Sequence, residues 1–379
     1  MTSEHKNKRK SLDILQLFRG LAAIAVTLFH IDLLIGEKFG DRFLWNFFQF
    51  GWTGVDYFLV LSGFIIIYTQ HRNFLKPNLE RFKDFLLKRF IRIYPVYWFV
   101  TLGILLAFTI VPGLQNNNPI TLPSIIKSFI LFPPSETILN VGWTLSVIFF
   151  FYLVFSLNYI LPRNLFFAVV GIIIIGSSSQ FINAFAVAPA DNAWFSLFFN
   201  LLYFEFVFGC IAAYFVLKYS LRYRKTIFWS GLGLLLLFSF FQTYGLIDDV
   251  NVVALWGIDF NINRVVFSGI PCLFLVMGAA SIDINETVNI PRPLIYLGDA
   301  SYSIYLIHSP IISALIQISL KLNISGVSDS YSPLGILIFI ISIGLSCIFY
   351  NLVEKPLTEY LRKQFIQRKV APAISAKSE

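Results

Sequence analysis

Charged side chains are scarce in this chain. They make up 13% of its 379 residues, while hydrophobic residues make up 57%, and the mean hydropathy is +0.72. A water-soluble domain carries roughly 25% charged residues. The composition therefore excludes an ordinary soluble globule and indicates a chain whose solvent is lipid.

Cysteine is also rare. Cys210, Cys272 and Cys347 each lie in an apolar run, and no CxxC or Cys/His spacing surrounds them. This pattern predicts neither a disulfide framework nor a metal site. We expect no cleavable signal peptide either, because the first apolar stretch, residues 12–35, is too long for one and contains an arginine and a histidine.

Long apolar runs dominate what is present. We expect an all-α, polytopic integral membrane protein with about ten transmembrane helices and no repeat of fixed period. The predicted spans are residues 12–35, 44–69, 90–111, 142–161, 165–180, 194–216, 227–246, 263–280, 295–319 and 332–353.

The basic residues predict the orientation of these spans. Of the 29 Lys and Arg residues, 23 fall on the N-terminal side of the membrane, five fall on the other side, and Arg19 lies inside the first span. The positive-inside rule then places both termini in the cytoplasm. We divide the chain into a basic N-terminus (1–11), a membrane domain (12–363) and a short tail (364–379). The net charge of +8 is explained by topology, so no nucleic-acid partner is expected.

Arg19 and His30 stand out because charged and titratable side chains are costly inside a bilayer, at about 3 kcal/mol or more for a charge. Eleven residues at about 100° each bring the helix to within about 20° of three full turns, so both side chains project from one face, about 16 Å apart along the axis. With the N-terminus inside, His30 lies toward the outer half of the membrane. The alternative is a hydrogen-bonded packing histidine.

Lys88, Arg89 and Arg92 open the third predicted span in the segment KRFIRIYP. Arg89 and Arg92 are three residues apart and so share a helix face, an arrangement suited to bidentate phosphate contacts. A membrane anchor that follows the positive-inside rule is an equally good interpretation.

Several further polar residues fall within or at the ends of the predicted spans. Each is expected to face the protein interior, either as a partner of Arg19 or His30 or as a member of an ion pair that holds helices together. They are Asp56, Glu205, His308 and Glu354.

Six motifs together resemble the membrane-bound acyltransferase-3 family, and they follow the family's order from about residue 12 to residue 363. They are LFRGLAAIAVTLFH, which contains Arg19 and His30, then GVDYFLVLSGF, RFIRIYPVYW, GWTLSVIFFFYLVF, GDASYSIYLIHSP and VEKP. The ILQLFRGLAA opening and the absence of a fused esterase domain are most similar to the exopolysaccharide-modifying branch.

The resemblance implies transfer of an acyl group, usually acetyl from acetyl-CoA, to a glycan hydroxyl. His30 and Arg19 match the family's conserved histidine and its preceding arginine, and Arg89 and Arg92 match its cytoplasmic Arg-x-x-Arg motif. Further conserved positions are matched by Trp143 and Glu354. The family implies a location in the bacterial cytoplasmic (inner) membrane.

One position departs from the family. Where members commonly carry glutamate after the Trp-[Ser/Thr]-Leu motif, this chain has Ile148. Either that glutamate is dispensable here, or Glu136 or Glu205 substitutes for it, or the acceptor site has changed.

These observations lead to a transmembrane acyl relay as our hypothesis. Acetyl-CoA would be the donor substrate, with no permanently bound cofactor. Its phosphates would rest on Arg89 and Arg92 with Lys88, and its pantetheine arm would extend past Arg19 to His30. His30 would act as a general base or would form an acyl-histidine.

The acceptor would be a cell-surface glycan such as exopolysaccharide or O-antigen, or its lipid-linked precursor; a secondary metabolite is also compatible, and succinyl could replace acetyl. The alternative from another functional class is a transporter or flippase of a lipid-linked sugar. A sensory or scaffold protein would leave the aligned Arg19 and His30 unexplained. Two longer connections, 112–141 and 246–262, are expected outside the membrane, where they would shape an acceptor entrance or serve as linkers.

Overall fold

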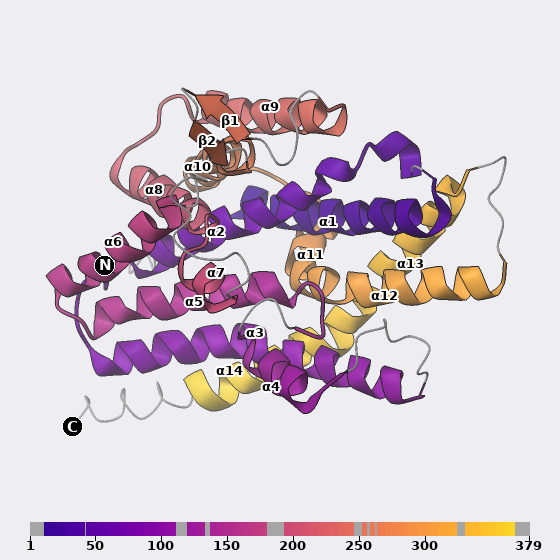
Figure 1. Cartoon of the computed structure of the whole chain (residues 1–379). Helices are drawn as coiled ribbons and strands as arrows, with labels where there is room; N and C mark the ends of the chain where they lie inside the picture. The colour runs from indigo at the N-terminus through magenta and orange to yellow at the C-terminus, as the bar shows by residue number, and fades with distance from the viewer. Residues whose placement is uncertain are drawn as a thin grey trace, which may run out of the picture.

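The fold is a bundle of helices, most of which run roughly along one direction (Figure 1). A computed structural model of the chain describes residues 11–41, 43–110, 120–132, 137–179, 193–245, 252–255, 258–261, 264–323 and 330–367. The first seven α-helices are α1 (Asp13–Phe39), α2 (Thr53–Gln70), α3 (Leu79–Ile110), α4 (Leu122–Ile130), α5 (Gly142–Ser156), α6 (Arg163–Ser178) and α7 (Ala193–Phe198). The other seven are α8 (Tyr203–Lys218), α9 (Arg224–Thr243), α10 (Ile270–Asn285), α11 (Arg292–Asp299), α12 (Ser301–Lys321), α13 (Ser332–Phe349) and α14 (Lys355–Arg362).

Short elements join these helices. The 3₁₀ turns η1 (Phe43–Asn46) and η2 (Gln49–Trp52) precede α2, and η5 (Leu157–Tyr159) follows α5. The π-helical turns η8 (Val265–Gly269), η9 (Tyr350–Glu354) and η10 (Lys363–Gln367) extend α10, α13 and α14. Strands β1 (Val252–Leu255) and β2 (Ile258–Asn261) form an antiparallel hairpin in the long 246–262 connection.

The prediction of a polytopic, all-helical membrane protein is confirmed. Among the described residues, nine helical segments are long and apolar enough to cross a membrane, and α6 is a shorter apolar helix in the position of the fifth predicted span. Large apolar side chains are exposed on their outer faces, such as Ile175 at 72% and Leu106 at 62%. Such faces are stable only against lipid.

Several segments differ from the sequence-based expectation. The predicted span 194–216 is divided into α7 and α8, and the connection 112–141 contains α4. Helix α3 begins at Leu79 instead of residue 90, because its charged first turns continue the helix beyond the apolar run. The predicted span 295–319 is two helices, α11 and α12, which meet at Ala300. The connection 246–262 contains the β1–β2 hairpin where only a loop was expected, and its remaining residues lie outside the described part of the chain.

Helix α1 lies at the centre of the bundle, where it packs against α2, α10, α11, α12 and α13. Gly20 and Gly298 permit its close approach to α11. A Cβ atom on Gly298 would lie 2.0 Å from the carbonyl oxygen of Gln16, and one on Gly20 would lie 3.0 Å from the backbone nitrogen of Gly298. Small residues at such crossings are the usual way for membrane helices to pack. The contact brings Asp299, the next residue, beside α1.

The two described ends of the chain meet at one side of the bundle. Leu12 in front of α1 and Arg362 at the end of α14 line the same cavity. Pro356 lacks a backbone N–H, and the helix widens into the π-turn η9 just before it, so that Glu354 is directed into this region. Ends on one side agree with an even number of crossings, while their cytoplasmic location stays a prediction from the charges.

Candidate functional site

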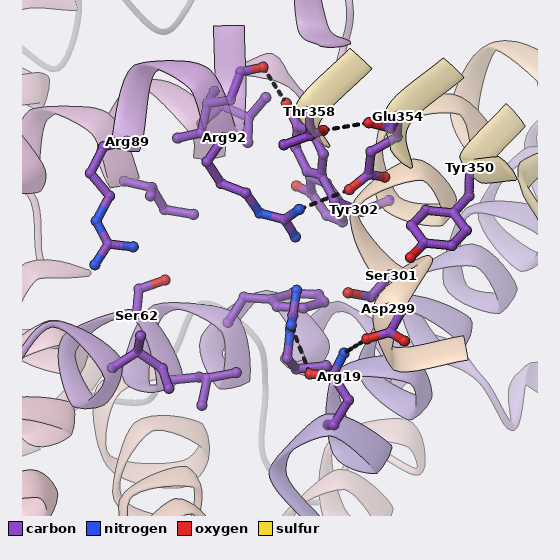
Figure 2. Close-up of a pocket in the computed structure, with 18 of the residues that line it drawn as sticks. Arg19, Ser62, Arg89, Arg92, Asp299, Ser301, Tyr302, Tyr350, Glu354 and Thr358 are labelled. Carbon is purple, nitrogen blue, oxygen red and sulfur yellow. Dashed lines mark hydrogen bonds and ion pairs between the residues drawn. The ribbon is translucent and has the colours of Figure 1, made fainter. Parts of the chain in front are cut away.

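A cavity of about 480 Å³ opens between α1, α2, α3, α5, α12 and α14 (Figure 2). This volume is typical of a small-molecule site. The charged residues that line it are Arg19, Arg89, Arg92, Asp299, Glu354, Lys355, Glu359 and Arg362. Five cations therefore face three carboxylates, so the cavity favours an anionic ligand.

Arg92 is held in place by two neighbours. Its Nη1 donates to Oε1 of Glu354 at 2.8 Å, and its guanidinium lies 5.3 Å from the ring centroid of Tyr302. Glu354 is buried, and its second oxygen, Oε2, accepts a hydrogen bond of 2.6 Å from Ser303. Because Glu354 is bound on both oxygens, it fixes one edge of Arg92 and leaves the other directed into the cavity.

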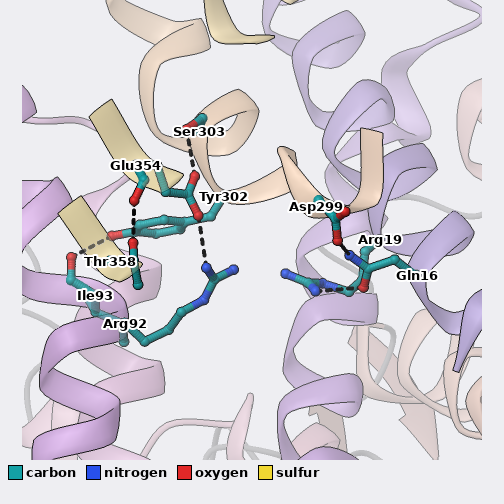
Figure 3. Close-up of polar contacts among 9 residues, drawn as sticks. All are labelled: Gln16, Arg19, Arg92, Ile93, Asp299, Tyr302, Ser303, Glu354 and Thr358. Carbon is teal, nitrogen blue, oxygen red and sulfur yellow. Dashed lines mark hydrogen bonds and ion pairs between the residues drawn. The ribbon is translucent and has the colours of Figure 1, made fainter. Parts of the chain in front are cut away.

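Arg19 approaches from the opposite wall (Figure 3). Its Nη1 donates to Oε1 of Gln16 at 2.8 Å, and Nε2 of Gln16 donates to Oδ1 of Asp299. Figure 3 shows the guanidinium groups of Arg19 and Arg92 directed at each other across the cavity. Two like charges in this arrangement repel, so an anion between them relieves the repulsion and gains hydrogen bonds to both.

Arg89 lies one helical turn before Arg92 and has a different environment. Its guanidinium contacts two rings that pack against each other, 5.3 Å from the centroid of Phe85 and 4.9 Å from that of Tyr152. No carboxylate pairs with it among the described residues, and its buried Nε has no hydrogen-bond partner there. Arg89 is therefore positioned by its aromatic neighbours and is available to an anion. The neighbouring Lys88 is exposed and does not line the cavity.

One part of the cavity wall is mainly apolar and includes Tyr305. The hydroxyl group of Tyr305 shares a hydrogen bond of 2.6 Å with that of Thr144, and its ring lies 5.8 Å from that of Phe58. Ile148, one turn after Thr144, also lines this wall. The residue that departs from the family pattern thus faces the cavity and keeps its wall apolar.

His30 lies just beyond Tyr305 and is not one of the lining residues. The ring of Tyr305 lies 5.9 Å from that of His308, and Nε2 of His308 lies 3.2 Å from Nδ1 of His30. Arg19 is linked through Gln16 to Asp299, and His30 contacts His308 on the helix that follows. Both side chains of α1 therefore face the same neighbouring segment, in agreement with the helical phase.

Asp56 and Glu205 form a separate buried cluster with Arg264. Nε of Arg264 donates to Oδ1 of Asp56 at 2.7 Å, and its guanidinium lies 4.9 Å from the Trp52 ring centroid. Both carboxyl side chains have 0% exposure. Neither carboxyl side chain lines the cavity. Trp143, another residue selected from the sequence, does not line it either and packs against the apolar core. Of the two candidates to replace the family's glutamate, Glu205 is thus away from the Ile148 wall, and Glu136 lies outside the described residues.

Sequence reasoning missed several cavity residues. Asp299, Tyr302 and Tyr305 lie in the same motif as His308, and this motif is the signal that could have found them. Arg264, which lies outside the cavity, stands at the end of the predicted span 263–280, and nothing in its local sequence signals its pairing with Asp56. The described residues contain no group of three His, Cys, Asp or Glu side chains that could hold a metal ion.

Comparison with known proteins agrees with the motifs. The family model for the acyltransferase-3 type of acyltransferase domain matches residues 12–351. The exopolysaccharide production protein ExoZ of Rhizobium meliloti (strain 1021) is 30% identical over 333 residues, 85% of this chain and 92% of that protein. A putative acetyltransferase, ORF330, of Acidianus two-tailed virus is 27% identical over 315 residues, 80% of this chain and 85% of the viral protein. No solved structure matches the chain. By the extent of these matches, the chain belongs to the acyltransferase-3 family and is a multi-pass membrane acyltransferase.

Proposed function

We propose that this acyltransferase moves an acetyl group from cytoplasmic acetyl-CoA, through the cavity, to a hydroxyl group of a cell-surface glycan or its lipid-linked precursor. The observation that carries the proposal is the pair of guanidinium groups, Arg19 and Arg92, which face each other across the cavity (Figure 3). The cavity also includes Tyr305, whose ring contacts His308, the neighbour of His30. The two guanidinium groups suit the phosphates of a donor, and the histidines suit the reaction of its acyl group.

The basic end of the cavity supports an acyl-CoA donor. Arg89, Arg92 and Arg362 line it together with Lys355, and guanidinium groups bind phosphate oxygens in bidentate geometry. Excess positive charge on this side of the bundle agrees with a cytoplasmic opening, where acetyl-CoA is found. Lys88, which is exposed, would add only long-range attraction.

The apolar end supports acetyl over succinyl. Val55, Phe58, Leu145 and Ile148 line the wall near Tyr305. A succinyl group would bring its one free carboxylate against these side chains, and burial of an unpaired carboxylate is costly. A short neutral acyl group meets no such penalty.

His30 is the proposed catalytic residue, as general base for the acceptor hydroxyl. General-base catalysis by a positioned histidine contributes about 10²–10⁴-fold to a rate. Its place toward the outer half of the first span suits an acceptor that approaches from outside the cytoplasm. The relative named for exopolysaccharide production supports a glycan acceptor, and the proposed location is the bacterial cytoplasmic membrane.

The direct test is transfer of label from radiolabelled acetyl-CoA by purified protein in detergent, without any ion gradient. We expect His30→Ala to reduce transfer by at least about 100-fold, while His71→Ala, at an exposed histidine, leaves it unchanged. Full activity of His30→Ala would refute the catalytic role. A label that stays bound to wild-type protein after rapid denaturation at neutral pH, is absent from His30→Ala protein and is released by acid would indicate an acyl-histidine instead of direct transfer.

The acceptor is identified by mass spectrometry of surface glycans from a deletion strain and from the same strain complemented with wild-type or His30→Ala protein. We expect loss of an acetyl ester that only the wild-type gene restores. Loss of a succinyl ester would mean that the donor is succinyl-CoA and not acetyl-CoA. Transport of a lipid-linked sugar without any change in acylation would contradict the proposal.

A further inference from the structure

We propose that His308 is a positioning residue, which holds the ring of His30 with its hydrogen on Nδ1 so that Nε2 is the atom that takes the acceptor's proton. This inference rests on the proposed function, because it assigns an atom to the general base. His308 is fully buried on α12 and, like His30, is not among the residues that line the cavity. Its contact with His30 joins α12 to the central helix.

The hydrogen position on His308 follows from its carbonyl contact. Nδ1 of His308 lies 3.0 Å from the carbonyl oxygen of Ile304. A carbonyl oxygen can only accept, so this nitrogen must carry the hydrogen. A neutral imidazole has one N–H, so Nε2 of His308 has a lone pair and acts as an acceptor. No carboxylate bonds to His308 among the described residues, which favours the neutral ring at this buried position.

The same reasoning then applies to His30. Its Nδ1 lies 2.9 Å from the carbonyl oxygen of Val26 and 3.2 Å from Nε2 of His308. Both neighbours are acceptors, so Nδ1 of His30 carries the hydrogen and shares it between them. Nε2 of His30 is left with its lone pair, and no described residue makes a hydrogen bond to it. The free base is therefore Nε2.

His308 contributes what Val26 cannot supply alone. The carbonyl oxygen of Val26 also accepts the backbone N–H of His30, as in any α-helix. It therefore accepts two hydrogen bonds, and the one from the ring is weaker. His308 is a second acceptor, fixed by burial and by Ile304, and it stops the His30 ring from turning. It also stabilises the ring once Nε2 is protonated, because the positive imidazolium donates more strongly through Nδ1–H.

The transfer step balances with these two residues. The acceptor O–H bond breaks as its proton forms an N–H bond at Nε2 of His30. The alkoxide oxygen forms a bond to the thioester carbon, and the C–S bond breaks to release a thiolate. The thiolate takes the proton from Nε2, which yields the free thiol of CoA and restores neutral His30. His308 keeps its own proton throughout.

The tautomer is tested directly by NMR of the full-length protein carrying ¹⁵N-labelled histidine. The chain has only four histidines, so His30→Gln, His308→Leu and the exposed control His71→Gln assign the signals. In wild-type protein we expect both His30 and His308 to carry hydrogen on Nδ1. Hydrogen on Nε2 of His30 in wild-type protein would overturn the inference whatever the variants do.

Two variants at position 308 separate positioning from packing. In His308→Gln an amide oxygen can still accept from His30, and in His308→Leu no acceptor remains. We expect His308→Leu to lower kcat by about 100-fold, with the KM for acetyl-CoA unchanged, and to give a mixture of His30 tautomers. His308→Gln should retain kcat within about tenfold of wild type. Equal loss in both variants, or unchanged kcat in His308→Leu, would contradict the positioning role.

Failure of this inference and failure of the proposed function give different results. If wild-type protein transfers no acetyl group while His30 carries its hydrogen on Nδ1, the proposed function fails and the hydrogen-bond assignment stands. If transfer depends on His30 but not on His308, the proposed function stands and the positioning role is wrong.

Discussion

Arg92 on α3 and Glu354 in the π-turn η9 form an ion pair of 2.8 Å although they are 262 residues apart in the chain. The side chain of Glu354 is only 2% exposed, and that of Arg92 is 29% exposed. The buried partner is thus the fixed one, and it determines where the guanidinium is directed. The pair also joins the third membrane helix to the end of the last one, on the side of the cavity that bears the positive charge.

Glu354→Gln should impair donor binding even though it removes a negative charge from a site for an anion. The amide keeps the size of the side chain but no longer holds Arg92 by charge, so we expect the KM for acetyl-CoA to rise about tenfold. Glu359→Gln is the matched control, because Glu359 lines the same cavity but is exposed. If both substitutions lower the KM equally, simple charge dominates and the positioning role of Glu354 is wrong.

Arg89→Ala should raise the KM for acetyl-CoA by about ten- to 100-fold, because one charge-assisted contact to a phosphate is worth about 1.5–3 kcal/mol. Arg89→Lys should recover little of this loss, since an ammonium group lacks the planar face with which the guanidinium contacts the rings of Phe85 and Tyr152 and cannot bind phosphate in bidentate geometry. Steady-state kinetics in detergent measure the effect. Lys88→Ala, at the exposed neighbouring position, should leave the KM unchanged; a loss equal to that of Arg89→Ala would mean that the pair is only an anchor at the membrane surface.

The membrane fold could be predicted from this sequence because its signal is local. An apolar run of about 20 residues has one stable structure in lipid. Helix ends carry a weaker signal, which is why the start of α3 at Leu79 was missed: its first turns are charged and lie outside the apolar run. The break at Ala300 was missed for a different reason, since the close contact of Gly298 with Gln16 depends on another helix.

The candidate site was predictable in its composition but not in its pairings. A charge within an apolar run is visible in the sequence, so Arg19, Arg92 and Glu354 could be selected one by one. Their partners are determined by tertiary packing: Glu354 pairs with Arg92, and Arg19 is held through Gln16. Arg264 was missed because it lies at the end of a span, where a cation costs little and signals nothing.

Asp56→Asn should destabilise the protein more than Glu205→Gln does. Asp56 is the ion-pair partner of Arg264, and removal of one member of a buried pair leaves the other unpaired. Because Arg264 is 35% exposed, we expect a loss near the lower end of the usual range, about 3 kcal/mol in the free energy of unfolding. Glu205 has no cation bonded to it, so a neutral amide of the same shape should cost much less. Unfolding in mixed micelles measures both, and equal losses would show that the two carboxylates share Arg264.

Asp283→Ala should loosen the attachment of α1, which carries both Arg19 and His30. Helix α1 has no side-chain cap of its own. Its first N–H groups are bound instead by Asp283 on α10, which accepts from the backbone nitrogen of Ile14 at 3.0 Å and from that of Leu15 at 3.2 Å.

Loss of such a cap costs about 1–2 kcal/mol, so the unfolding midpoint of Asp283→Ala should be lower than that of wild type. The midpoint of Asp283→Asn, which keeps one acceptor oxygen, should be lowered less. Asn285→Ala is the control, because Asn285 bonds only to Ser281 within its own helix. Since Asp283 does not line the cavity, the KM for acetyl-CoA should stay near the wild-type value at temperatures where Asp283→Ala remains folded. A stability of Asp283→Ala equal to that of wild type would mean that water replaces the carboxylate at the start of α1.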